Sequence, residues 1–268
     1  MGSDRVRIEA RVLGAVLVPF LVAAFVFLTF EQPRSGELFA WQVNPPIMAA
    51  FVGAGYLGGA YYFMRVIFGR KWHRLAAGLP PISAFVWFML IATVLHWSRF
   101  DVSHFPFQVW LLIYVLAPVL VPALWWFSRK ADDGAAEPGD RTVPDWLRQL
   151  IGLLGLSFSL FAAVCLVVPA VVAANWFWTM TPLLARILGG WTALLGVGGM
   201  TLYFEPRWSG WRIEIESIAL WHALVVWACF RNLGDFTAPV NLFVIGEILG
   251  LIGFVALYLF MSSRPAGR

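Results

Sequence analysis

The chain has 268 residues, of which 60% are hydrophobic and 13% are charged, and its formal net charge is +4. An ordinary soluble domain carries about twice this share of charged residues, so the composition excludes a protein whose surface mainly faces water. The sequence therefore predicts an all-α integral membrane protein whose helices contact the lipid bilayer.

Eight apolar runs are long enough to cross a bilayer, which takes about 20 residues of helix. The first run ends in Phe-Glu-Gln-Pro instead of a small-residue cleavage site, so we expect a retained helix and not a signal peptide. With prolines and polar breaks as boundaries, the predicted spans are residues 12–30, 46–68, 79–97, 107–127, 147–173, 181–204, 213–230 and 240–261.

Orientation is predicted from lysine and arginine alone, because acidic residues contribute little to the positive-inside bias. With the N-terminus inside, the outer loops hold only Arg34, Arg99 and Arg231, and Arg186 falls within a helix. The inner segments hold the other basic residues: Arg5, Arg7, Arg11, Arg65, Arg70, Lys71, Arg74, Arg129, Lys130, Arg141, Arg148, Arg207, Arg212, Arg264 and Arg268. We therefore expect a multi-pass protein of the cell (inner) membrane with both termini cytoplasmic. Because this bias accounts for the positive net charge, nucleic-acid binding is not predicted.

The two halves of the chain resemble each other. A shift of 137 residues superimposes residues 41–45 (Trp-Gln-Val-Asn-Pro) on residues 178–182 (Trp-Thr-Met-Thr-Pro). Shifts of 134 and 133 residues align further pairs in the same order: Ser83 with Ser217, Trp87 with Trp221, Asp101 with Asp235, Pro106 with Pro239 and Gln108 with Asn241. A duplication explains this order, and an even number of spans in each half makes the halves parallel. The predicted organisation is a four-helix repeat in residues 1–127, a flexible cytoplasmic linker in residues 128–145 and a second four-helix repeat in residues 146–268.

Small residues at helical spacing allow helices to approach closely in a membrane. They occur in the second, sixth and eighth predicted spans: Gly55, Gly59, Gly196, Gly198, Gly199, Gly246, Gly250 and Gly253. We therefore expect these three spans to form the interior of the bundle.

Two ionisable side chains stand out within the spans, Arg186 in the sixth and Glu247 in the eighth. Their depths from the predicted outer face are about 7 and 12 Å at 1.5 Å per residue, so they are expected to pair or to share a polar cavity. In the first repeat Tyr114 takes the place of Glu247, and Gln108 and Asn241 extend the predicted ligand or transport site at its outer end. The alternative is an ion pair that only locks two helices together.

A second polar group lies in the predicted outer loop between spans three and four. The spacing of His96 and Asp101, His-x-x-x-x-Asp, resembles a lipid acyltransferase motif, and with His104 the group contains possible zinc ligands. Such a motif normally acts at the cytoplasmic face, and Asp101 matches Asp235 in the second repeat, which favours a shared turn. We predict no catalytic residue and no metal site, and the sequence identifies no cofactor.

The sequence contains no P-loop, no nucleophile elbow and no dinucleotide fingerprint. It favours a small-solute or hydrophobic-ligand transporter or carrier with a polar site between the repeats, whose partner would be a hydrophobic small molecule. The first alternative is an accessory or assembly subunit that binds another membrane protein. The second alternative is an outer-face membrane enzyme that uses His96, Asp101 and His104.

Overall fold

The computed structural model describes residues 4–263 and is helical throughout this range, with no named strand. Eight of the described helical segments are long and apolar enough to cross a membrane, as predicted. They are α1 (Ile8–Phe30), α3 (Pro46–Phe68), α4 (His73–Ala76) with α5 (Leu79–Leu95), α6 (Phe105–Ser128), α7 (Asp145–Val167), α9 (Pro182–Phe204), α10 (Trp208–Arg231) and α11 (Val240–Ser263). The shorter helices are α2 (Ser35–Leu38) and α8 (Pro169–Ala174).

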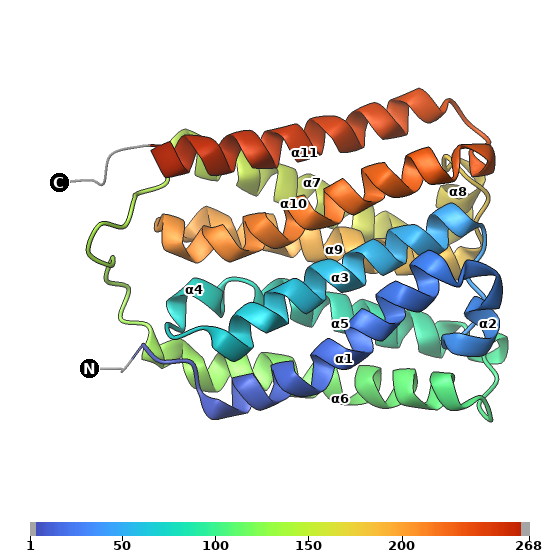
Figure 1. Ribbon diagram of the computed structural model, residues 1–268, viewed down its shortest axis with the longest axis horizontal. Coiled ribbons are helices and arrows are strands. Elements are labelled where there is room, and N and C mark those ends of the chain that lie inside the picture. The colour runs from blue at the N-terminus through green and yellow to red at the C-terminus, as the bar shows by residue number, and fades with distance from the viewer. Residues whose placement is uncertain (1–3, 264–268) are drawn as a thin grey trace.

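The long helices run side by side along the longest axis of the molecule (Figure 1). One end, here called the linker end, holds the start of α1, the end of α11, α4 and the connection between α6 and α7. The opposite end, here called the α2 end, holds α2 and α8. The helices are thus compatible with a multi-pass membrane protein in which α1 begins and α11 ends on the same side.

Two helices, α3 and α9, form the interior of the bundle. In their most apolar windows 78% of the α3 residues and 67% of the α9 residues are buried. Helix α3 packs mainly against α1 and α10, whereas α9 packs mainly against α7 and α5. The remaining close pairs are α5 with α6 and α10 with α11. Each central helix therefore contacts one helix of its own half and one of the other half.

The expectation that the eighth span belongs to the interior is wrong. Only 6% of the α11 window is buried, and a Cβ atom added at Gly246 or Gly253 would meet nothing within 4 Å. Among the three glycines of this helix, Gly250 alone faces a neighbour, the imidazole of His222. The glycine pattern predicted the two central helices and failed for α11, because small residues permit close packing without requiring it.

Two predicted boundaries also shift. The fifth span ends at Val167 instead of residue 173, because Pro169 has no N–H to continue the helix and begins α8. The seventh span begins at Trp208 instead of residue 213, where the Trp208 amide donates to the Arg141 carbonyl (2.8 Å). The longer α10 places Glu214 inside a membrane-spanning helix.

Glycines allow α7 and α9 to pack with their backbones in contact. A Cβ atom at Gly155 would lie 2.7 Å from the carbonyl oxygen of Gly196, and one at Gly199 would lie 2.7 Å from that of Ile151. No side chain fits at either distance. Lipid supplies no hydrophobic driving force for helix association, so this close van der Waals packing holds the pair together.

We predict that Gly155→Leu destabilises the protein by about 1–3 kcal/mol, because the new side chain must push α7 away from α9. Unfolding in mixed micelles of increasing SDS fraction, followed by tryptophan fluorescence, measures the change. The matched control is Gly246→Leu on the open face of α11, which should leave the midpoint unchanged. Equal shifts for the two variants would contradict this account of the α7–α9 contact.

Candidate functional site

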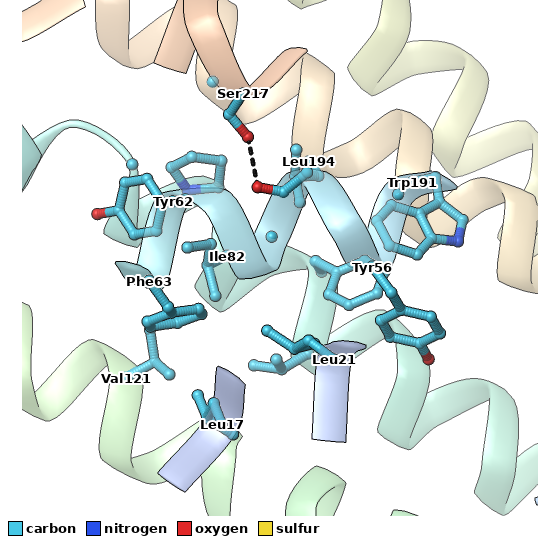
Figure 2. A pocket seen from close by; sticks show the side chains of 18 of the residues that line it. Leu17, Leu21, Tyr56, Tyr62, Phe63, Ile82, Val121, Trp191, Leu194 and Ser217 are labelled. Carbon is cyan, nitrogen blue, oxygen red and sulfur yellow. Dashed lines mark hydrogen bonds between the residues drawn. The ribbon is translucent and has the colours of Figure 1, made fainter. Parts of the chain in front are cut away.

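A cavity of about 110 Å³ lies at the centre of the bundle, where helices of both halves meet. Figure 2 shows Tyr62 and Phe63 on one side of it and Tyr56 and Trp191 on the other. Leucines of α1, the start of α5, the middle of α6 and the first half of α10 complete the wall. The cavity therefore belongs to neither half alone.

Aromatic rings make up much of this wall and touch one another. The ring centroids of Trp191 lie 4.3 Å from Phe85, 5.4 Å from Tyr56 and 5.4 Å from Trp221. The hydroxyl of Tyr56 lies 3.2 Å from that of Tyr114, so these two polar atoms satisfy each other. The cavity consequently presents ring faces and edges, with few free polar atoms.

Glycines of α3 make room for the rings and for the cavity. A Cβ atom at Gly55 would lie 2.5 Å from Cζ3 of Trp191, so only glycine admits the indole there. At Gly59 the nearest atom is Cδ1 of Leu21 at 3.8 Å, which leaves space unfilled. One turn of α3 thus closes around a ring, and the next leaves an opening.

The polar side chains at the cavity come from α10. The Ser217 hydroxyl donates to the Gly58 carbonyl oxygen (2.8 Å) and joins α10 to α3 across the two halves (Figure 2). Glu214 is buried, with 7% of its surface exposed, and its Oε1 atom has no hydrogen-bond partner among the described residues. Glu214 is the one carboxylate that lines the cavity, and no described lysine, arginine or histidine lines it.

An apolar groove of about 330 Å³ adjoins the cavity between α1 and α6. Leu17, Leu21, Tyr56, Ile113 and Tyr114 line both spaces. Since α1 packs mainly on α3, and α6 packs mainly on α5, the groove lies between two helices that have other main partners. It extends toward the α2 end, where its lining includes residues of α2.

Of the predicted site residues, Tyr114 lines this cavity, and the others lie elsewhere. Gln108 donates to the Val102 carbonyl oxygen (3.0 Å) near the start of α6 and is exposed. Asn241 is exposed near the start of α11. Neither Arg186 nor Glu247 lines the cavity or the groove.

The expected pairing of Arg186 with Glu247 is wrong. Arg186 contacts His96 Nε2 (2.6 Å) and donates to the Leu166 carbonyl oxygen (3.0 Å). Glu247 instead contacts His222 Nδ1 (2.7 Å), a residue for which the sequence suggested no partner. The physical reason is helix order: α11 packs on α10, whereas α9 packs on α7 and α5. Similar depth did not bring the two charges onto facing helices.

The residues proposed for an outer-face enzyme do not gather. Asp101 accepts hydrogen bonds from the amide and hydroxyl of Ser103, and His104 Nε2 lies 3.0 Å from the Phe39 carbonyl oxygen. Burial lowers the pKa of His96, and the nearby charges of Arg186 and Arg99 lower it further, so its imidazole is a neutral acceptor for Arg186. The described residues contain no cluster of three or more His, Cys, Asp and Glu able to hold a metal ion.

A further polar cluster, not anticipated from the sequence, lies at the linker end around His73. The imidazole is 2% exposed, and its Nδ1 lies 2.7 Å from Asp4 Oδ2. Its Nε2 lies 2.8 Å from Glu137 Oε1 and 3.1 Å from Ser209 Oγ. The order Asp–His–Ser resembles a hydrolase triad, but the Ser209 hydroxyl donates to Asp140 (2.5 Å). The serine is therefore not activated by His73, and the cluster acts as a junction between chain segments.

Glu137 ties the linker to this junction. Both of its carboxylate oxygens accept from Arg74 at 2.6 Å. These hydrogen bonds, with the charges of Arg74, His73 and Lys71, lower the pKa of Glu137 to about 2. The linker was expected to be flexible, but Asp132 also accepts from Arg207, which leaves both sides of its glycine turn attached. A linker that appears polar and open in sequence is therefore docked.

We predict that Glu137→Gln exposes the linker to trypsin at Arg129 and Lys130 about tenfold more, as expected for the loss of roughly 1.4 kcal/mol of charge-assisted hydrogen bonding. In the unmodified chain the same release should occur on acidification. The pKa of Glu137 is depressed from 4.5 to about 2, so its stabilising effect is complete above pH 4.5 and is lost as the pH falls toward 2.

Limited proteolysis with trypsin at neutral pH and with pepsin between pH 2 and 5 measures these effects (working ranges approximate). The control is Asp133→Asn, which removes an exposed carboxylate that accepts only from the Ala135 amide nearby in sequence. Equal cleavage of Glu137→Gln and the unmodified chain would show that the linker is not held by this ion pair.

The chain matches no known protein-family model, no curated protein and no solved structure.

Proposed function

We propose that the chain is an inner-membrane protein of two parallel four-helix repeats, related by a two-fold axis along the membrane normal. The main packing pairs support this arrangement, because each pair in one half has a counterpart in the other. The counterparts are α1–α3 with α7–α9, α3–α10 with α9–α5, and α5–α6 with α10–α11.

Backbone contacts at the linker end support the same proposal. In each half, the segment before the first helix pairs with the loop that follows the central helix. The offset between the two sets is 137 residues for one strand of the pairing and 136 for the other. The matching hydrogen bonds are Val6 N to Arg70 O (3.3 Å) and Val143 N to Pro206 O (2.8 Å), then Trp72 N to Asp4 O (3.2 Å) and Trp208 N to Arg141 O (2.8 Å).

The linker end is proposed to face the cytoplasm, with both termini on that side. Most of the arginine and lysine side chains flank the membrane spans at this end, including Arg65, Arg70, Lys71 and Arg74 in the connection from α3 to α5. Positive loops are retained on the cytoplasmic side during insertion. The α2 end carries few basic residues and would face outward.

The function that the geometry supports best is binding and carriage of a hydrophobic or amphipathic small molecule. One observation carries the proposal: the cavity between the two halves shares five lining residues with a groove that opens sideways between α1 and α6. A ligand dissolved in the bilayer can enter such a groove without crossing water. Deep, largely apolar concave sites with few polar groups are typical of small-molecule binding.

Photolabelling tests the proposal. A neutral long-chain alcohol that carries a diazirine is added to the protein in nanodiscs, and the labelled peptides are mapped by mass spectrometry. We expect labelling of the residues that the groove and cavity share, in α1, α3 and α6. Even labelling of all lipid-facing helices would contradict a specific site.

We predict that Gly59→Phe lowers this labelling at least about fivefold, because the ring occupies the open side of the cavity at the cost of a few kcal/mol of ligand binding. Gly246→Phe is the matched control, since its side chain enters open space on α11. Native mass spectrometry of both variants checks their folding and oligomeric state. Unchanged labelling of Gly59→Phe would exclude the cavity as the site, and a stoichiometric protein partner without any labelling would favour an accessory subunit.

A further inference from the structure

We infer that the central cavity binds the positively charged head of a lipophilic ammonium ligand, with Glu214 as its counter-ion and the groove between α1 and α6 holding its alkyl chain. The inference rests on the proposed carrier function and adds the chemical class of the ligand. It depends on the charge balance of α10, the composition of the wall and the size of the cavity.

The first step is the charge balance of α10. Glu214 and Glu216 lie two residues apart on the helix and face different surroundings. Glu216 accepts from the Tyr61 hydroxyl, Arg65 (3.0 Å) and Arg212 (2.9 Å). Glu214 accepts no hydrogen bond from any described residue. The basic side chains of this region are thus committed to one carboxylate, and the other has no cation in the described chain.

The second step is the cost of that arrangement. Glu214 lies six residues into α10, about 9 Å from its start at 1.5 Å per residue, and is more than nine-tenths buried. A buried carboxylate needs a compensating charge or hydrogen-bond donors, and neither comes from the residues that line the cavity. A ligand cation supplies what the chain does not.

The third step is the wall opposite the carboxylate. Tyr56, Tyr114, Trp191 and Phe85 form one connected group of rings. The face of an aromatic ring carries negative charge density and attracts a cation, most strongly for tryptophan and for methylated ammonium groups. A cavity that combines such rings with one carboxylate selects a cation over a neutral group of the same shape.

The fourth step is size. A cavity of about 150 Å³ holds a benzene molecule, so the space of about 110 Å³ in this protein accepts a group of similar or slightly smaller size. An ammonium that carries methyl groups meets this limit, whereas a multi-ring cation does not. The remainder of the ligand must therefore lie in the adjoining groove, whose lining is almost wholly apolar. This favours a single alkyl chain.

Competition against the neutral photolabel tests the inference. The two competitors are an alkyltrimethylammonium and its carbon analogue, in which a tert-butyl group replaces the charged head at the same chain length. We expect the cation to compete at least about tenfold better in the unmodified protein, because only the cation gains the carboxylate and the ring faces.

Two variants assign that preference to Glu214. Glu214→Gln should remove the preference while keeping the labelling itself, since the shape of the cavity is conserved. Glu216→Gln, the same change two residues away, should keep the preference. Labelling by the neutral probe alone reports whether each variant is folded and has an open cavity.

The outcomes separate this inference from the proposed function. Equal competition by the cation and the carbon analogue overturns the inference and leaves the carrier function standing, with Glu214 then held as the neutral acid. A cation preference that survives Glu214→Gln also overturns it. Absence of specific labelling in the unmodified protein overturns both the inference and the proposed function.

Discussion

The rest of the structure depends on the close approach of two glycine-bearing helices, α3 and α9, to their neighbours. Lipid competes with other helices for apolar side chains, so helices stay together through shape and van der Waals contact. Gly155 and Gly199 bring the α7 and α9 backbones into contact, and Ser217 bonds to the α3 backbone at Gly58. With both central helices held in this way, the outer helices can present nearly all of their surface to lipid, as α11 does.

The cavity follows from the same constraint. A glycine face that a neighbouring backbone covers becomes a tight contact, whereas one that only side chains approach leaves space between them. The indole of Trp191 fills the space over Gly55, but nothing fills the space over Gly59. Because α3–α10 and α5–α9 are contacts between halves, a small displacement of one half against the other would alter this space more than any other part of the bundle. A binding site placed here is coupled to the one interface able to move.

The sequence was informative along the helix axis and much less so around it. Apolar length gave eight spans with most of their ends, and glycine spacing identified α3 and α9. The partners of Arg186 and Glu247 were wrong, because depth follows from residue number, whereas the direction that a side chain faces depends on which helices pack together. Glu214 was missed for a related reason. It lies near the basic end of its helix, where a charged side chain usually reaches water.

The distribution of polar groups within the spans separates structure from function more clearly than their number. His222 satisfies Glu247, His96 accepts from Arg186, and two arginines neutralise Glu216. These groups explain themselves, because removing one member would leave the other unpaired in a medium that solvates it poorly. Glu214 is the exception, and it faces the space between the halves. A buried charge that the chain leaves unbalanced, beside a cavity open to the bilayer, is the position where a ligand has most to add.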